Sequence, residues 1–195
     1  MDARIAFGLF GLFHTMLIAS YLPLSDPSLS TLSLLAVSAA LVYDNLIIAV
    51  GHALSNDLLL ALSKPRFFLH LLLTPQLAGA ALAHFNFGLT AWICSWAMVG
   101  LGFGIEHSAH ANLVIVEYRG TVRYTQRPIV PPIPAILTTV IMLALGAYYR
   151  EWNLFLGSFA MFLLAAAPPS KVGPIPGQFG EVLILWGTWA TIASG

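Results

Sequence analysis

Seven long apolar runs, separated by short polar breaks, constrain this chain more than any other feature. A helix that crosses a bilayer needs about 20 predominantly apolar residues, with a range of roughly 17 to 25. Seven segments meet or approach that length: 5–21, 32–54, 67–84, 89–116, 133–149, 152–167 and 180–193. The runs lack the alternation of apolar and polar residues that marks a membrane β-barrel. We therefore predict an all-α polytopic membrane protein, with residues 1–195 forming one seven-transmembrane-helix bundle.

The composition supports this class. Hydrophobic residues make up 58% of the chain and charged residues only 8%, whereas about a quarter of the residues of a soluble domain are charged. This inventory is too small to cover a water-facing surface. The net charge is zero and there is no charged tail, so we expect no nucleic-acid partner. Cys94 is the only cysteine, which excludes a disulfide framework and a cysteine metal site.

The basic residues predict how the bundle is oriented. Loops on the inner side of a membrane carry an excess of Lys and Arg. If the N-terminus is inside and the C-terminus outside, seven of the eight basic residues lie on the inner side: Arg4, Lys64, Arg66, Arg119, Arg123, Arg127 and Lys171. A six-span arrangement would scatter the same charges over both faces. The charge distribution therefore favours seven spans.

With this orientation, ionisable residues gather between the midplane and the inner face of the membrane. They are His14, Asp44, His52, His70, Glu106, His107, His110 and Glu181. A charge inside the membrane costs several kcal/mol unless it is paired or wetted, so such residues usually face a bundle interior. We predict one polar cavity, enclosed by the first four spans and the seventh, that opens toward the inner side.

Three of these residues fall close together at the end of the fourth run. Glu106 and His110 are four positions apart, and His107 and His110 three, so they would share a helix face. Glu106 and His110 are candidates for acid–base catalysis. Together with His107, and with His70 from the third run, they are also candidate metal ligands. The alternative is that they only satisfy one another between helices.

Two carboxylates are further catalytic candidates. Asp44 lies near the middle of the second run, where an unpaired carboxylate is costly, so we interpret it as a proton-handling group. The alternative is a hydrogen bond to Asn45 or a histidine that only fixes the packing. Glu181 follows a Pro- and Gly-rich loop, and the backbone dipole at a helix N-terminus explains a carboxylate there equally well.

Other residues are candidates for binding a cofactor or substrate. His52 and His70 lie at similar depth on adjacent spans, which would suit two axial haem ligands, although histidines are also common at membrane interfaces. Side chains near the cavity could bind a substrate: Asn45, Arg66, Arg119, Arg123, Trp96 and Trp186. The arginines could hold a phosphate or carboxylate head group; the alternative is attraction to anionic lipid.

The leading functional hypothesis is an intramembrane enzyme of the isomerase, cyclase or hydrolase type. It would act on a lipid-like or isoprenoid substrate by acid–base or metal-assisted chemistry, with membrane lipid around it. One alternative is a haem- or pigment-binding subunit that associates with other membrane subunits, and another is a proton or small-anion transporter. The cofactor stays open between none, a divalent metal and haem or pigment. The default location is the plasma membrane, with a thylakoid or other organellar membrane as the alternative.

Overall fold

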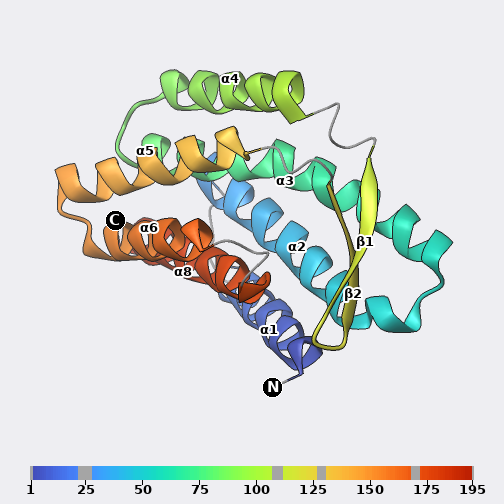
Figure 1. Ribbon diagram of the computed structural model, residues 1–195. Coiled ribbons are helices and arrows are strands. Elements are labelled where there is room, and N and C mark those ends of the chain that lie inside the picture. Colours follow the sequence, from blue (N-terminus) through green and yellow to red (C-terminus); the bar gives the residue numbers. More distant parts are fainter. Residues whose placement is uncertain (1, 22–27, 107–111, 127–130, 168–171, 195) are drawn as a thin grey trace.

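Helices form most of the structure, and one β-hairpin crosses their ends (Figure 1). The computed structural model describes residues 2–21, 28–106, 112–126, 131–167 and 172–194. Within these ranges the elements are α1 (Ala3–Tyr21), α2 (Leu29–Val50), the short 3-10 helix η1 (Gly51–Ala53), α3 (Asn56–His84), α4 (Leu89–Glu106), β1 (Leu113–Tyr118), β2 (Thr121–Gln126), α5 (Ile133–Tyr149), α6 (Trp152–Ala166) and α8 (Ile175–Ala193). The predicted helical class is thus confirmed.

Among the described residues, three helical segments are long and apolar enough to cross a membrane. They are α1, α2 continued through η1, and α3. Helices α5 and α6 are also apolar but have only 17 and 15 residues. At 1.5 Å per residue they are about 26 and 22 Å long, against roughly 30 Å of hydrocarbon. Large apolar side chains face outward, as expected of helices in lipid: Leu9, Leu12, Met16, Ile93, Leu156 and Leu163.

The main apolar core lies between helices from both halves of the chain. It joins α1, α2, α3, α5, α6 and α8 through Leu17, Leu34, Val37, Leu41, Leu77, Met142, Leu145, Leu154, Ile184 and Leu185. Helix α4 lies against α3 at the edge of this assembly (Figure 1). Helices α6 and α8 pack closely, because glycines face each other. A Cβ on Gly157 would lie 2.5 Å from the Leu183 carbonyl oxygen and 3.4 Å from the Gly187 Cα.

Helix α3 begins earlier than the sequence pattern predicts. The third apolar run starts at residue 67, and the preceding SNDLL…SKPR stretch resembles a loop. In the structure the helix begins at Asn56 and continues through Pro65. The Ser55 side chain caps it by accepting a hydrogen bond from the Leu58 N–H at 3.4 Å. Arg66 therefore lies on helix α3, one turn before His70.

The prediction of one continuous helix over residues 89–116 is wrong for the second part of that range. Helix α4 ends at Glu106, and Leu113–Val116 belong to strand β1, which pairs antiparallel with β2. The tight turn uses left-handed backbone at Arg119 (φ 44°) and Gly120 (φ 87°), as two-residue hairpin turns require. The β-branched residues on both sides of that Arg-Gly pair are the signal of the hairpin. The apolarity of the run concealed this signal.

The hairpin lies across one end of the helix bundle. The Ala3 N–H donates to the Arg119 carbonyl at 3.0 Å, so the turn of the hairpin meets the start of α1. The Tyr124 hydroxyl donates to the Asn56 carbonyl at 3.4 Å, which ties β2 to the start of α3. Strand β2 also packs on η1 at the end of α2. The hairpin therefore covers the end of the bundle where α1 and α3 begin and α2 ends.

Candidate functional site

Asp44 of α2 is the centre of a buried polar cluster. Its side chain is only 1% exposed. Arg66 Nε forms an ion pair with Oδ1, and the Gln178 amide donates to Oδ2 at 3.3 Å. His70 Nε2 also lies 3.3 Å from Oδ2 and donates when that nitrogen carries the proton. The carboxylate thus joins α2 to α3 and α8.

Arg66 is held from several sides in addition to Asp44. Its side chain is 8% exposed, and its guanidinium carbon lies 4.7 Å from the centre of the Phe67 ring. Its Nη1 donates to the Tyr124 carbonyl of β2 at 3.5 Å. Because burying a charge is costly unless it is paired, these contacts explain how an arginine is accommodated here.

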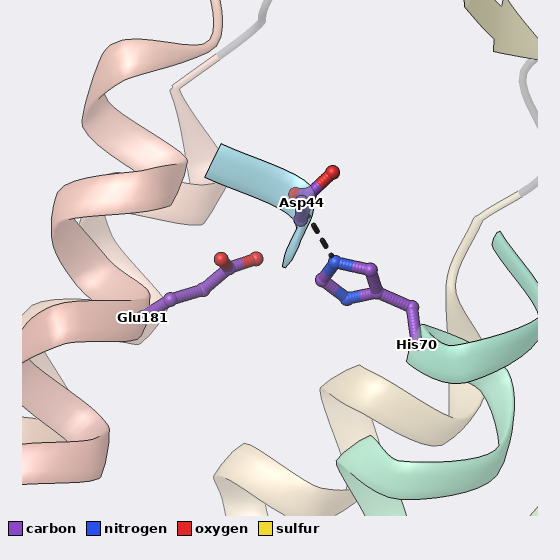
Figure 2. A group of neighbouring side chains, drawn as sticks. All are labelled: Asp44, His70 and Glu181. Carbon is purple, nitrogen blue, oxygen red and sulfur yellow. Dashed lines mark hydrogen bonds and ion pairs between the residues drawn. The ribbon is translucent and has the colours of Figure 1, made fainter. Parts of the chain in front are cut away.

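Glu181 of α8 completes a group of three potential proton donors or metal ligands. One ligand atom each of Asp44, His70 and Glu181 lies within 4.8 Å of the other two. Figure 2 shows the Glu181 carboxylate extending from α8 toward the other two side chains. Its Oε2 is buried and has no hydrogen-bond partner among the described residues. Two carboxylates and one imidazole therefore face a common point, and one oxygen is free to bind something else.

Arg123 brings a second guanidinium from strand β2. Its Nε is buried and finds no hydrogen-bond partner within the described part of the chain. Burial lowers the pKa of Arg123 to about 10, with a further lowering by the Arg66 charge, while Asp44 and Glu181 act in the opposite direction. The side chain is still positively charged at neutral pH. The hairpin thus adds a cation to the cluster.

The cluster lines a cavity of about 330 Å³. The walls are formed by Asp44, Arg66, Phe67, His70, Leu71, Thr74, Gln126, Pro132, Pro134, Ala135, Met161, Ala165, Gly177, Gln178 and Glu181. An apolar cavity of about 400 Å³ lies between α5 and α6. The two share four lining residues: Pro132, Ala135, Met161 and Ala165. The polar cavity therefore continues into an apolar groove between two outward-facing helices.

Several predicted site residues lie away from this cavity. Asn45 is fully buried, and its amide donates to the Leu41 carbonyl of its own helix at 2.8 Å. Trp96, which is 57% exposed, lines a separate cavity between α2, α3 and α4, and Trp186 is 40% exposed. Arg119 is exposed at the hairpin turn, with its guanidinium 5.4 Å from the Tyr118 ring. The structure gives these four residues no part in the cluster.

The histidine predictions have mixed outcomes. His70 lies in the cluster, whereas His52 is exposed and lies 3.1 Å from Arg4 Nη1. The two imidazoles thus have different partners, an arrangement that lends no support to a shared haem. The site predicted from Glu106, His107 and His110 cannot be placed, because both histidines and the Glu106 side chain lie outside the described residues.

Gln178 and His14 are buried near Asp44, but of the two only His14 is predicted from the sequence as a polar residue inside the bundle. Gln178 donates to the carboxylate, but it lies in a Pro- and Gly-rich stretch that resembles a loop. Helix α8 in fact begins at Ile175, so Gln178 and Glu181 are three positions apart on one helix face. That spacing was the available signal that Gln178 belongs to the site.

His14 of α1, expected in the inner half, is fully buried, and neither ring nitrogen has a partner among the described residues.

The arrangement has the groups for two kinds of chemistry. An imidazole beside two carboxylates can move a proton to or from a bound molecule, and the same three groups can ligate a divalent cation. The arginines Arg66 and Arg123 can attract an anionic group. Comparison with family models, curated proteins and solved structures finds no match to this chain.

Proposed function

We propose that the protein is a membrane enzyme that acts on the polar end of a lipid-like or isoprenoid substrate, by acid–base or metal-assisted chemistry. One observation carries the proposal. Asp44, His70 and Glu181 converge from three helices in a cavity that continues into an apolar groove between α5 and α6. A substrate with a reactive polar end and a hydrocarbon chain matches both parts.

The apolar groove supports a lipid-like substrate. Its walls are Pro132, Ala135, Ile136, Thr139, Met161, Phe162, Ala165 and Ala166. Ile136 and Phe162 are 42% and 45% exposed, so this part of the surface would face lipid in a membrane. A hydrocarbon chain could enter sideways from the bilayer, without passing through water, while its polar end reaches the cluster.

The unpaired polar atoms support catalysis over a purely structural role. Leaving a buried donor or acceptor without a partner costs about 1–3 kcal/mol. Glu181 Oε2 and Arg123 Nε are both in this condition among the described residues. A cluster that served only to hold helices together would be expected to satisfy these atoms. Glu181 lines the cavity, so a ligand bound there would supply the missing partner of its Oε2.

The geometry suggests a role for each residue. Asp44 accepts from His70 and so orients the imidazole, which takes or gives the proton at the substrate. Glu181, across the cavity, serves as the second proton-transfer group. Arg66 and Gln178 contact Asp44 and are positioning residues. Arg123 brings positive charge toward an anionic part of the substrate.

We further propose a seven-helix membrane arrangement, with the N-terminus on the cytoplasmic side of the plasma membrane. The distribution of basic residues supports it. The contacts of Ala3 with Arg119 and of Asn56 with Tyr124 bring the start of α1, the hairpin and the start of α3 to one end of the bundle, together with their basic residues. The short helices α5 and α6 would then require a locally thinner bilayer.

Lipid turnover in vesicles tests the enzymatic proposal. The full-length protein is reconstituted in vesicles made from the total lipid extract of its host, and lipids are followed by untargeted mass spectrometry. We expect the wild-type protein to convert at least one lipid species, and Glu181→Gln to abolish that conversion. Glu117→Gln, on the exposed side of β1, is the matched control and should keep full activity. Equal conversion by all three proteins, or by none, would contradict the proposal.

A further inference from the structure

We propose that Asp44, His70 and Glu181 bind one divalent metal ion of the zinc type. This inference rests on the proposed function only in that both assign the chemistry to the same cavity. The three residues offer one imidazole nitrogen and two carboxylate oxygens, which are among the ligands that zinc takes in proteins. They come from α3, α2 and α8, so the ion would fix three helices around one point.

The spacing of two of the ligand atoms fits a shared metal as well as a long hydrogen bond. Zinc binds nitrogen and oxygen ligands at about 2.0–2.2 Å, so two ligands of a tetrahedral ion lie about 3.4 Å apart. His70 Nε2 and Asp44 Oδ2 are separated by 3.3 Å. The usual N–H···O hydrogen bond is shorter, at about 2.9–3.0 Å. The two atoms already have the separation of neighbouring ligands.

Glu181 is placed to be the third ligand. Its ligand oxygen lies within 4.8 Å of those of Asp44 and His70, and its Oε2 is buried with no hydrogen-bond partner in the described ranges. A small rotation of this flexible side chain would bring an oxygen to the ion. Three protein ligands leave one tetrahedral position for water or substrate, as catalytic zinc sites do.

The residues behind the ligands fit the same assignment. Ligating carboxylates are themselves usually held by hydrogen bonds or charged groups, which fix their orientation. Arg66 contacts the Oδ1 atom of Asp44, and Gln178 donates to Oδ2. Asp44 would therefore keep its orientation whether or not the ion is bound.

The charge balance indicates what the loaded site would attract. The two carboxylates of Asp44 and Glu181 are offset by the two guanidinium groups of Arg66 and Arg123. A divalent cation would make the site strongly positive at the end of an apolar groove. Such a site would favour an amphiphile whose head group carries a negative charge, such as a phosphate or a carboxylate.

Metal analysis tests the site without any knowledge of the substrate. The full-length protein is purified in mild detergent without chelator, and bound metals are measured by mass spectrometry. The variants His70→Gln and Glu181→Gln are compared with the matched surface variants His52→Gln and Glu117→Gln. We expect one zinc or similar ion per chain in the wild-type protein and both surface variants, and loss of that ion in both site variants. Circular dichroism checks that the variants keep their helices.

A titration of the wild-type protein guards against variants that fail to fold. After removal of metal with a chelator, calorimetry with Zn²⁺ should show one site per chain. The metal site would be overturned if the wild-type protein held no metal and took up no Zn²⁺. It would also be overturned if all variants held the same amount of metal, because the metal would then be an adventitious ion only. If lipid conversion still required Glu181 in a metal-free protein, the proposed function would stand and only the metal site would fall. If the protein bound one ion but converted no lipid, the metal site would stand and the proposed function would fall.

Discussion

Arg66 of α3 forms an ion pair with Asp44 of α2 inside the helix bundle, where their side chains are only 8% and 1% exposed. Each charge depends on the other, because either alone would be buried without compensation. The pair also fixes the carboxylate that His70 and Gln178 contact. Stability and site geometry are therefore coupled through these two residues.

Removing Arg66 should destabilise the protein strongly. Breaking a buried ion pair by deleting one partner typically costs about 3–5 kcal/mol, since it leaves a buried charge alone. We expect Arg66→Met to lower the free energy of unfolding by about that amount, as measured by denaturation in detergent micelles. Lys64→Met, on the exposed side of the same helix, is the control. The double variant Asp44→Asn/Arg66→Met should be less destabilised than Arg66→Met alone. Equal stability of Arg66→Met and the control would contradict this reading.

The contact between α6 and α8 should tolerate no added methyl group. A Cβ on Gly157 would lie 2.5 Å from the Leu183 carbonyl oxygen, whereas nothing lies within 4 Å of one on Gly100 of α4. Gly157→Ala should cost about 1–3 kcal/mol through overpacking. Gly100→Ala should be neutral or stabilise by up to about 1 kcal/mol, since alanine favours the helix. Thermal unfolding followed by circular dichroism separates the two, and similar shifts would argue against close helix packing.

Cysteine labelling tests the proposed orientation. After Cys94→Ala removes the native thiol, single cysteines are placed at the exposed Glu117 of the hairpin and at Tyr148 near the end of α5. A membrane-impermeant thiol reagent should label Tyr148→Cys from the outer side of intact cells. It should label Glu117→Cys only in inside-out vesicles. Labelling of both positions from the same side would refute the seven-span, N-inside arrangement.

Blocking the apolar groove should impair substrate entry. Ala165 lines both the polar cavity and the groove, so a bulky side chain there would occupy the path of a hydrocarbon chain. We expect Ala165→Trp to raise the KM for lipid conversion more than tenfold, and to do so less for a short-chain substrate. Ala97→Trp, at an exposed position on α4, should leave KM unchanged. An unchanged KM in Ala165→Trp would show that the substrate does not enter through the groove.

The sequence reveals much of the cluster because ionisable residues inside apolar runs are costly. Asp44, His70 and Glu181 stand out on that ground, and Arg66 and Arg123 through the excess of basic residues near the cavity mouth. Gln178 does not stand out, since an uncharged amide in a Pro- and Gly-rich stretch resembles an ordinary loop residue.

The positions that depend on three-dimensional arrangement were harder to predict. The hairpin was concealed because its β-branched residues prolong an apolar run, and the start of α3 because its first turns contain charged residues and Pro65. Trp96 and Trp186 were expected near the polar cavity, but Trp96 instead lines a separate cavity between α2, α3 and α4, and Trp186 is 40% exposed. Depth in the membrane follows from sequence position, but the direction of a side chain requires the packing of neighbouring helices.

We propose above all that Asp44 and Glu181 act together in one site on a lipid-like substrate. Groups that act as a unit show non-additive losses, because removing either already disables the unit. The most direct measurement is the rate of lipid conversion by Asp44→Asn, Glu181→Gln and the double variant in vesicles. We expect each single variant to lose most of the activity, and the double variant to be about as slow as either one. Losses that multiply in the double variant, or full activity in either single variant, would contradict this proposal.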